Sequence, residues 1–508
     1  MAFYNGLLSV DSSKLLLLSI ISYFIYVHLL KPSLHYIYTV IHYHGFYCQP
    51  KSFLLGHLRQ IWPNFPFSID KKTLAASIYK QLYKNVGPDP SRSLSVLWVS
   101  LFPLVFASGH EIVEEILHKK NLRKPVINKF VGVGDGLLSS APALWKIRRK
   151  LIEPFFSTRK MRDHAKNMYQ EVESFGEQLD EEVGKPIDLI NHIHTSTLNI
   201  ILKSSAGIPL DDLREDKEAL VELVATLERN AVYRIGNPFY HFDWIFNLST
   251  FSKAYYKTIE TIEGKIHNIF RRRKQLLQSS PSNESENQDF LSLIEGKVDD
   301  QGLYDELITL IGAGHETTAV ALRWNLFNLG NHLDVQEKLY QEIIQFFPDD
   351  TPVDDMDKLK ECVYLEQIIK ESLRLNPSVA GSARVLEDDV MVKGQRLIKG
   401  SIVGVSGLAT HHDPSIYPDP EKFDPDRWSP ENVSKIPKTA WIPFGYGPRM
   451  CIGWRYAMLE LKIYTAQIIR KFSLKSTRPH GSIPILYEIT YQPSLPLEII
   501  MTPRNNNQ

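Results

Sequence analysis

Apolar residues recur every three or four positions along most of the chain, which is the spacing of amphipathic helices. This pattern predicts helices near residues 110–118, 143–156, 160–183, 211–230, 251–278, 302–329, 334–346, 362–375 and 452–472. Residues 94–107 predict two short strands around a turn, and further short strands are predicted at 390–392, 401–405, 488–491 and 497–501. No internal repeat and no second linker divides the chain. We therefore predict one large, mainly α domain with small β-sheets (α+β), over residues 61–508.

An uncharged apolar run lies near the N-terminus. Residues 15–30 read LLLLSIISYFIYVHLL and stand between Lys14 and Lys31. A helix that crosses a bilayer needs about 20 residues, so snorkelling lysines would have to cover a small deficit. We predict a transmembrane anchor over residues 1–31 and a linker over 32–60. A cleaved signal peptide, for which no small-residue cleavage site follows, and a buried core helix remain alternatives.

Composition narrows the class of protein. The 508 residues are 43% hydrophobic, which is typical of a globular chain. The 58 basic and 58 acidic side chains cancel, which argues against nucleic acid as the main partner. Three cysteines in so long a chain exclude a disulfide framework, and we expect a reducing compartment.

The segment with the clearest chemical pattern is residues 444–453, which read FGYGPRMCIG. Gly445, Gly447 and Pro448 predict a tight turn, and Cys451 stands where the last long helix is predicted to begin. The free N–H groups and the dipole of a helix start favour a thiolate, which is a soft metal ligand or a nucleophile. Zinc partners at ligand spacing are absent from the local sequence, whereas axial ligation of a haem iron needs only one thiolate. Taken alone, the motif leaves a catalytic nucleophile or a small buried cysteine open.

On these residues the chain resembles the cytochrome P-450 superfamily of haem-thiolate monooxygenases, of the microsomal type. The match covers Phe444, Gly447, Arg449, Cys451 and Gly453. The resemblance implies that Cys451 is the axial ligand of a haem b iron. It also implies that Phe444 and Arg449 take part in binding the haem.

Two further segments match sites where the family binds the haem propionates. Trp145 and Arg149 stand four residues apart, so they share one face of a predicted helix. The family uses such a pair to hold a propionate, and guanidinium binds carboxylate with two parallel hydrogen bonds. Arg384 stands where family members often place another propionate donor. A basic surface helix is the alternative reading of the Trp145 segment.

The segment AGHETT at residues 313–318 lies midway along a predicted long helix. Gly312 and Gly314 each cost about 1 kcal/mol relative to alanine in a helix interior. The resemblance supplies a reason, because family members open this helix over the haem. It also implies that Glu316 and Thr317 form an acid–alcohol pair that delivers protons. The chain also resembles the fatty-acid hydroxylase branch, and in part of that branch a glutamate at the position of Ala313 bonds covalently to haem. Alanine cannot form this ester, so we predict non-covalent haem.

A third set of matching residues concerns the scaffold. Glu371 and Arg374 carry opposite charges three residues apart, and Arg427 lies in the segment FDPDRW at 423–428. The resemblance implies that these three residues form a buried structural triad. Removal of one partner from such a group costs several kcal/mol, so the triad is expected to stabilise the scaffold.

The resemblance implies a haem-dependent monooxygenase that inserts one atom of O2 into a small lipophilic substrate. Electrons would come from an NADPH-dependent two-flavin reductase, for which Lys146, Arg148 and Lys150 offer a docking surface. We expect the anchor in the endoplasmic reticulum membrane and the catalytic domain in the cytosol. A haem-thiolate isomerase or dehydratase that needs no reductase, and a non-catalytic haem or lipid-binding protein, are the alternative functions. The substrate pocket is expected near Phe130, Leu310, Ala313, residues 379–380 and residues 492–495.

Overall fold

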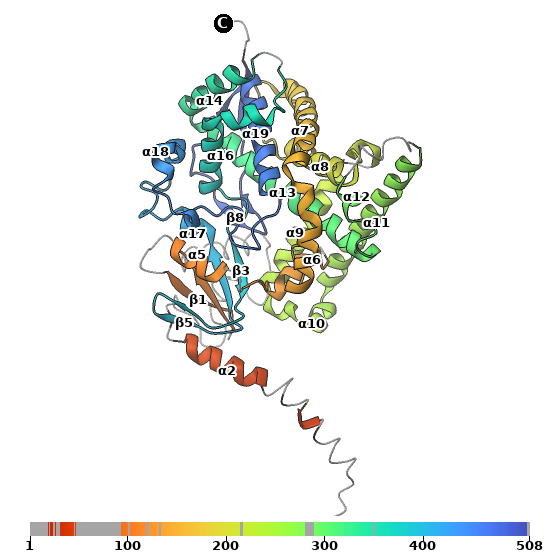
Figure 1. Ribbon diagram of the computed structural model, residues 1–508, viewed down its shortest axis with the longest axis vertical. Helices are drawn as coiled ribbons and strands as arrows, with labels where there is room; N and C mark the ends of the chain where they lie inside the picture. Colours follow the sequence, from red (N-terminus) through yellow and green to blue (C-terminus); the bar gives the residue numbers. More distant parts are fainter. Residues whose placement is uncertain are drawn as a thin grey trace, which may run out of the picture.

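The molecule is described here by a computed structural model. The structure describes residues 93–99, 102–117, 121–131, 134–213, 217–279, 289–348 and 351–504, and in the N-terminal region residues 19, 21–23, 26, 31–44 and 46. Two parts are visible in Figure 1, a larger helical part and a smaller part built on a sheet.

Helices make up most of the described chain. The long ones are α2 (Lys31–Tyr43), α6 (Pro142–Ile152), α7 (Thr158–Gln178), α8 (Ile190–Ala206), α9 (Lys217–Gly236), α11 (Thr250–Ser279), α13 (Asp300–Asn331), α14 (Leu333–Phe346), α16 (Val363–Leu375) and α19 (Trp454–Lys471). The short ones are α5 (His110–Leu117), α10 (Asp243–Leu248), α12 (Phe290–Ile294), α15 (Met356–Glu361), α17 (Gly407–His411) and α18 (Pro430–Val433). The mainly helical class is confirmed.

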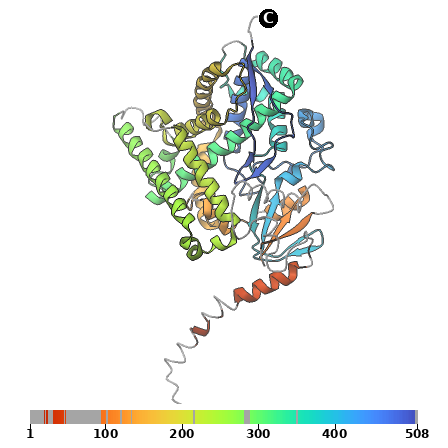
Figure 2. The ribbon, with the colours of Figure 1, turned by 180° about the vertical axis from the view of Figure 1, so that it is seen from behind.

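Helix α13 runs through the centre of the helical part (Figure 1). Its N-terminus is fixed by Asp299, whose carboxylate accepts a hydrogen bond of 2.9 Å from the Gly302 N–H. From residue 302 to residue 330 the buried positions lie on all sides of the helix. A helix that is apolar on all sides is a core helix. Helices α8, α16 and α19 pack against it, and α11 forms the outer edge of the helical part, as Figure 2 shows from behind.

The strands form small sheets. They are β1 (Leu94–Val99), β2 (Phe102–Ala107), β3 (Gly381–Val385), β4 (Val390–Val392), β5 (Gln395–Leu397), β6 (Ile402–Ser406), β7 (Phe472–Ser476), β8 (Ile485–Tyr487), β9 (Tyr491–Pro493) and β10 (Ile499–Pro503). The largest sheet has the order β1-β2-β6-β3, in which only the β2–β6 pair is parallel. The pairs β10–β7, β4–β5 and β8–β9 are separate antiparallel sheets.

The N-terminal region lies beside the four-stranded sheet. Helix α2, drawn in red in Figure 1, occupies part of the predicted linker. Its last residue, Tyr43, is fully buried, and the Tyr43 hydroxyl lies 2.9 Å from Ser401 Oγ. Most of the predicted anchor at 1–31 lies outside the described residues. Among the helices that the structure does describe, none combines the length and the apolar character that a membrane span requires.

The largest departure from the predicted elements is α8. The periodicity gave no helix between residues 183 and 211, whereas the structure has one over most of that interval. The predicted helix at 211–230 lies further along the chain, as α9, and the predicted helix at 452–472 begins at Trp454. The strands β3, β5, β7 and β8 were also not predicted, and the predicted strand at 488–491 overlaps β9 only at Tyr491.

Candidate active site

One cavity, of about 300 Å³, collects most of the residues that the motifs single out. It lies between α13 and the segment that precedes α19. The predicted residues that line it are Trp145, Arg149, Thr317, Arg384, Phe444, Arg449 and Cys451. We call this space the Cys451 cavity.

The segment 444–453 forms a compact loop at one wall of the Cys451 cavity. The Cys451 N–H donates a hydrogen bond of 2.9 Å to the Phe444 carbonyl, which closes the loop. Gly447 has φ +74°, and a Cβ there would lie 2.2 Å from the Leu117 carbonyl oxygen. Only glycine fits this position, because both the backbone angle and the lack of space exclude a side chain.

The surroundings of Cys451 differ from those of a helix start, which would favour a thiolate. Burial raises the pKa of the Cys451 thiol, and the Gly453 N–H and the cations Arg149 and Lys124 only partly offset this effect. Helix α19 begins three residues after Cys451, so the thiol is not held by the first turn of the helix. A bound metal ion would have to deprotonate the thiol, as metal ions do for coordinating thiols.

The walls of the Cys451 cavity are strongly cationic. Burial and the neighbouring guanidinium groups lower the pKa of Lys124 to about 7 and the pKa of Arg449 to about 10. Burial lowers the pKa of Arg384 to about 10, and the buried Arg384 Nε has no hydrogen-bond partner among the residues described. The carboxylate at this wall, Glu306, already forms an ion pair of 3.0 Å with Arg148. These side chains fit a dianionic ligand such as the two propionates of haem, next to a thiol that can ligate iron.

Arg449 and Trp145 support each other at the cavity wall. The Arg449 guanidinium carbon lies 4.5 Å from the centroid of the Trp145 ring. Its three nitrogens donate to backbone carbonyls, those of Leu122, Leu137 and Ser140, over 2.7–3.3 Å. Arg149 donates a bond of 2.8 Å to the Met450 carbonyl. Arg449 and Arg149 therefore tie the Cys451 loop to the segments around α6.

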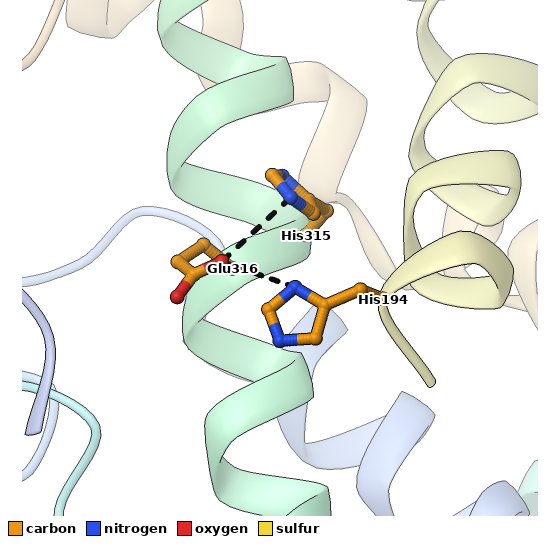
Figure 3. A group of neighbouring side chains, drawn as sticks. All are labelled: His194, His315 and Glu316. Carbon is orange, nitrogen blue, oxygen red and sulfur yellow. Dashed lines mark ion pairs between the residues drawn. The ribbon is translucent and has the colours of Figure 1, made fainter. Parts of the chain in front are cut away.

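Thr317 and Glu316 point in different directions from α13. Thr317 lines the Cys451 cavity, and its Oγ1 donates a bond of 2.7 Å to the Ala313 carbonyl. Glu316 is not among the lining residues; its carboxylate lies 3.1 Å from His194 Nδ1 of α8 (Figure 3). Consecutive helical residues differ by about 100° around the axis, so the two side chains cannot share one face. Burial raises the pKa of Glu316, but His194, His315 and Arg323 outweigh it and lower the pKa to about 2.

The expected opening of the central helix is not observed. Helix α13 is continuous from Asp300 to Asn331. Gly314 has a different role, because a Cβ there would lie 3.0 Å from two carbon atoms of Ile201 in α8. Gly312 leaves open space beside the cavity wall. The glycines therefore allow a close helix contact and an open wall rather than a break in the helix.

The residues of the predicted triad lie together in a buried network. Arg374 binds both oxygens of Glu371 at 2.8 and 2.9 Å, and Arg427 Nε lies 3.4 Å from Glu371 Oε1. Glu371 also accepts hydrogen bonds from the Trp428 indole and the Asp424 N–H. Both Glu371 and Arg374 are fully buried. The network gives the charges of Glu371 and Arg374 hydrogen-bonded partners, which a buried ion pair requires, whereas Arg427 Nε approaches Glu371 without a hydrogen bond.

One expectation about a neighbouring surface needs correction. Arg148 is buried, and besides its ion pair with Glu306 it donates to the Gly302 carbonyl, so it cannot belong to an exposed docking surface. Lys146 and Lys150 are exposed. Phe130 itself lies under the Arg234 guanidinium, with its ring centroid 4.3 Å from the guanidinium carbon. Its neighbours Ile127, Asn128 and Val131 line a cavity, in agreement with a pocket near Phe130.

A second cavity, of about 360 Å³, adjoins the first and shares Lys124, Ala313, Thr317, Val379 and Arg384 with it. We call it the aliphatic cavity, because no aromatic ring is among its described lining residues. The aliphatic residues that line it are Ile127, Val131, Leu138, Leu198, Leu202, Val224, Leu227, Ile235, Ile262, Ile266, Ile269, Ile308, Ile311, Val379 and Ile489. Its polar residues include Glu228, whose pKa is raised by burial and by the nearby Glu316 and Glu488.

Two residues at the site were not found from the sequence. Lys124 belongs to an irregular segment with no periodic pattern, and only its place in the fold brings it to the other cations. His194 belongs to α8, a helix whose buried face carries many polar residues. The only available signal for His194 was its place in a histidine-rich stretch, which does not identify a contact with Glu316.

The chain was compared with known proteins. A family model described as Cytochrome P450 matches residues 67–500. The chain is 33% identical over 395 residues to "Probable cytochrome P450 4ac3" of Drosophila melanogaster, which covers 74% of this chain and 77% of that protein. It is 29% identical over 422 residues to "Cytochrome P450 4c21" of Blattella germanica, covering 79% and 84% of the two chains. It is also 29% identical to "Cytochrome P450 4V2" of Homo sapiens over 434 residues, covering 81% and 82%.

Proposed function

The chain belongs to the cytochrome P450 family and is a haem-dependent monooxygenase with a cysteine thiolate as axial ligand, and from this premise we propose that Cys451 supplies that ligand. The observation that supports this proposal is the Cys451 cavity, in which the thiol of Cys451 and Thr317 line one space together with four cationic side chains. When bound, haem b supplies the iron at which dioxygen is activated.

We assign the remaining wall residues to haem binding. The cations Arg149, Arg384 and Arg449, with Trp145, would hold the propionates, and Lys124 adds a cation that the motifs do not include. Phe444 would contact the haem beside Cys451. Because three backbone carbonyls already orient Arg449, its guanidinium offers a preorganised charge rather than a mobile one.

Proton delivery is assigned to Thr317 and Glu316. The Thr317 hydroxyl faces the Cys451 cavity and can order water there, while Glu316 lies behind it as a carboxylate hydrogen-bonded by Thr490 and Gln492. A carboxylate at this depth can pass a proton toward Thr317 only through water or a change of rotamer, since the two side chains lie on different faces of α13. Because its lowered pKa keeps Glu316 ionised, we propose that it relays protons to the site from outside the cavity by taking up a proton and passing it on.

The substrate is proposed to be lipophilic and aliphatic. Apolar ligands are recognised mainly by the apolar area they bury, with few polar groups to orient them. The aliphatic cavity has branched aliphatic walls without aromatic rings among the described residues, which favours a flexible alkyl chain over a flat aromatic substrate. The polar side chain of Glu228 could orient a polar group of such a substrate.

The enzyme receives electrons from a redox partner, and we propose an NADPH-dependent two-flavin reductase. Lys146 and Lys150 would contribute to its docking surface. We further propose that residues 1–31 anchor the chain in the endoplasmic reticulum membrane with the catalytic domain in the cytosol. The uncharged run at 15–30 supports this proposal.

A ligand screen on the purified haem protein tests this assignment. Alkyl-chain compounds should shift the haem spin state and be hydroxylated when reductase and NADPH are present. Compounds with flat aromatic bodies of similar volume should bind more weakly. Product formation without NADPH would contradict the monooxygenase mechanism, and equal spectral responses to both classes would contradict the substrate proposal.

A further inference from the structure

A cluster of three buried side chains lies where α8 meets α13, behind the Cys451 cavity. His194, His315 and Glu316 are 5%, 0% and 3% exposed. One nitrogen or oxygen from each lies within 4.8 Å of the other two. Glu316 Oε2 is 3.1 Å from His194 Nδ1 and 3.8 Å from His315 Nε2. Figure 3 shows the three side chains directed toward one another, two from α13 and one from α8.

The hydrogen bonds of His315 leave a lone pair directed at a carboxylate. His315 Nδ1 lies 3.1 Å from the Ile311 carbonyl oxygen. A carbonyl only accepts, so Nδ1 carries the proton, and Nε2 of the neutral ring is an acceptor. This Nε2 is buried and has no hydrogen-bond partner among the described residues. An acceptor that faces the Glu316 carboxylate is unfavourable unless a cation lies between them.

The surroundings of the cluster match those of metal ligands. Metal-bound histidines usually donate their second ring N–H to a carbonyl or carboxylate, and ligating carboxylates are themselves hydrogen-bonded. His315 donates to Ile311 in this way. The second oxygen of Glu316, Oε1, accepts hydrogen bonds from Gln492 Nε2 and from Thr490 Oγ1, the latter over 3.3 Å. His315 and Glu316 therefore already have the supporting bonds that orient them, whereas the second ring nitrogen of His194, Nε2, has no hydrogen-bond partner among the described residues.

We propose that His194, His315 and Glu316 form a buried binding site for a divalent cation of the zinc class. Two imidazoles and one carboxylate are a donor set that binds zinc in proteins. Ligands at 2.0–2.2 Å from a tetrahedral ion stand about 3.3–3.6 Å apart. The distances of 3.1 and 3.8 Å from Glu316 lie on either side of that range, and the ligand atoms of the two histidines lie within 4.8 Å of each other, so side-chain movements would have to bring the three ligands together around the ion. The fourth position would be filled by water.

Occupancy of this site has a consequence for catalysis, and this consequence rests on the proposed role of Glu316. A cation bound to the Glu316 carboxylate prevents it from taking up and releasing a proton. Zinc should therefore inhibit turnover while leaving the Cys451 cavity and its haem intact. The binding of the metal itself does not depend on the proposed role.

The test uses the full-length haem protein and Zn²⁺ alone. Equilibrium dialysis counts bound zinc in the wild type, in His194→Ala and His315→Ala, and in the matched control His192→Ala. His192 lies in the same helix as His194, is partly exposed and does not belong to the cluster. We expect one zinc to be lost, or bound at least about tenfold more weakly, in the two cluster variants only. Equal zinc binding in all four proteins would overturn the proposal.

X-ray absorption at the zinc edge provides a measurement that needs no variant. The wild type loaded with one zinc should show two imidazoles and oxygen ligands at about 2.0–2.2 Å. A zinc coordination shell without imidazole would overturn the proposed site. This result does not depend on whether the cluster variants fold. Turnover separates the two claims. If zinc binds at the cluster but does not slow product formation, the metal site is supported and the proposed role of Glu316 is contradicted. If zinc does not bind, only the proposed metal site is contradicted.

Discussion

The two walls of the Cys451 cavity are built in different ways. One wall is the loop at 444–453, where the Cys451 N–H donates a hydrogen bond to the carbonyl of Phe444, a residue close to it in the chain. The other wall is α13, where the orientation of Glu316 depends on His194, far away in the sequence. The loop wall is defined by local backbone geometry, whereas the α13 wall is defined by the packing of two helices. A short motif can therefore specify the first wall but not the second.

The loop wall also rests on a buried network that the α13 wall lacks. Aromatic contacts lead from the Glu371 network through Trp428 and Trp441 to Phe444, with ring centroids 5.6 and 6.2 Å apart. The Trp441 indole donates to the Lys370 carbonyl of α16. The α13 wall instead depends on the close approach of Gly314 to Ile201. Damage to the loop wall should therefore affect folding, and damage to the α13 wall should affect chemistry.

The largest effect is expected from Glu371→Gln. This change leaves the buried Arg374 guanidinium without its carboxylate, which costs about 3–5 kcal/mol. Urea unfolding and the haem content per chain should both show the loss. Asp357→Asn, which breaks an exposed pair with Lys360, serves as the control and should change neither. A stable, fully haem-loaded Glu371→Gln protein would contradict the structural role of the network.

The second effect concerns His164, which packs against Tyr456 of α19, the helix that follows the loop wall in the chain. Burial lowers the pKa of His164 to about 4, and its bond to the Phe155 carbonyl only partly offsets this. Between pH 6.5 and 4 the unfolded chain binds a proton that the folded chain does not, so stability is lost as pH falls through this window. The loss approaches about 3 kcal/mol. Unfolding free energies from pH 7 to 4 should show a shallower loss for His164→Gln, and an unchanged slope would contradict this assignment.

Thr317→Ala should act on chemistry without affecting the fold. Removal of the hydroxyl at the α13 wall should lower product formation about 10²-fold, because positioned acid–base groups contribute about 10²–10⁴. The carbon monoxide spectrum and the unfolding free energy should stay unchanged. Thr317→Ser keeps the hydroxyl and should recover most of the rate. Full product formation by Thr317→Ala would remove Thr317 from proton delivery.

The smallest effect is expected at the exposed face of α6, outside both walls. The double variant Lys146→Glu and Lys150→Glu should slow reduction by the reductase several-fold at low salt, with the difference vanishing at high salt. Lys185→Glu, another exposed lysine, is the control. Reduction rates that do not differ at low salt would contradict the proposed docking surface.

The sequence predicted those parts of the fold that depend on local pattern. The period of three to four residues located α13, α14 and α16, and the turn and cysteine motif located the loop wall. Helix α8 was not predicted, because its buried side includes polar residues that interrupt the apolar pattern, namely His194, Ser196, Thr197 and Asn199. The helix ends at Gly207, whose backbone lies in the left-handed region. A glycine of this kind indicates where a helix can end, but it does not show that a helix precedes it.

The direction of side chains at the site was the harder part to predict. The motif placed Glu316 and Thr317 side by side in the chain, and only the packing of α8 and the β8–β9 segment turns Glu316 away from the cavity. Lys124 could not be found, because an irregular segment gives no sign of what it will face. The charge of Arg148 suggested a surface residue, whereas its pairing with Glu306 buries it.

The most direct test of the central claim is the carbon monoxide difference spectrum of the reduced protein. If the sulfur of Cys451 ligates the haem iron, the dithionite-reduced wild type should show the red-shifted Soret band of a thiolate-ligated haem. Cys451→Ala should lose that band while the unfolding transition remains cooperative. Absence of the band from the haem-loaded wild type, or its persistence in Cys451→Ala, would contradict the account.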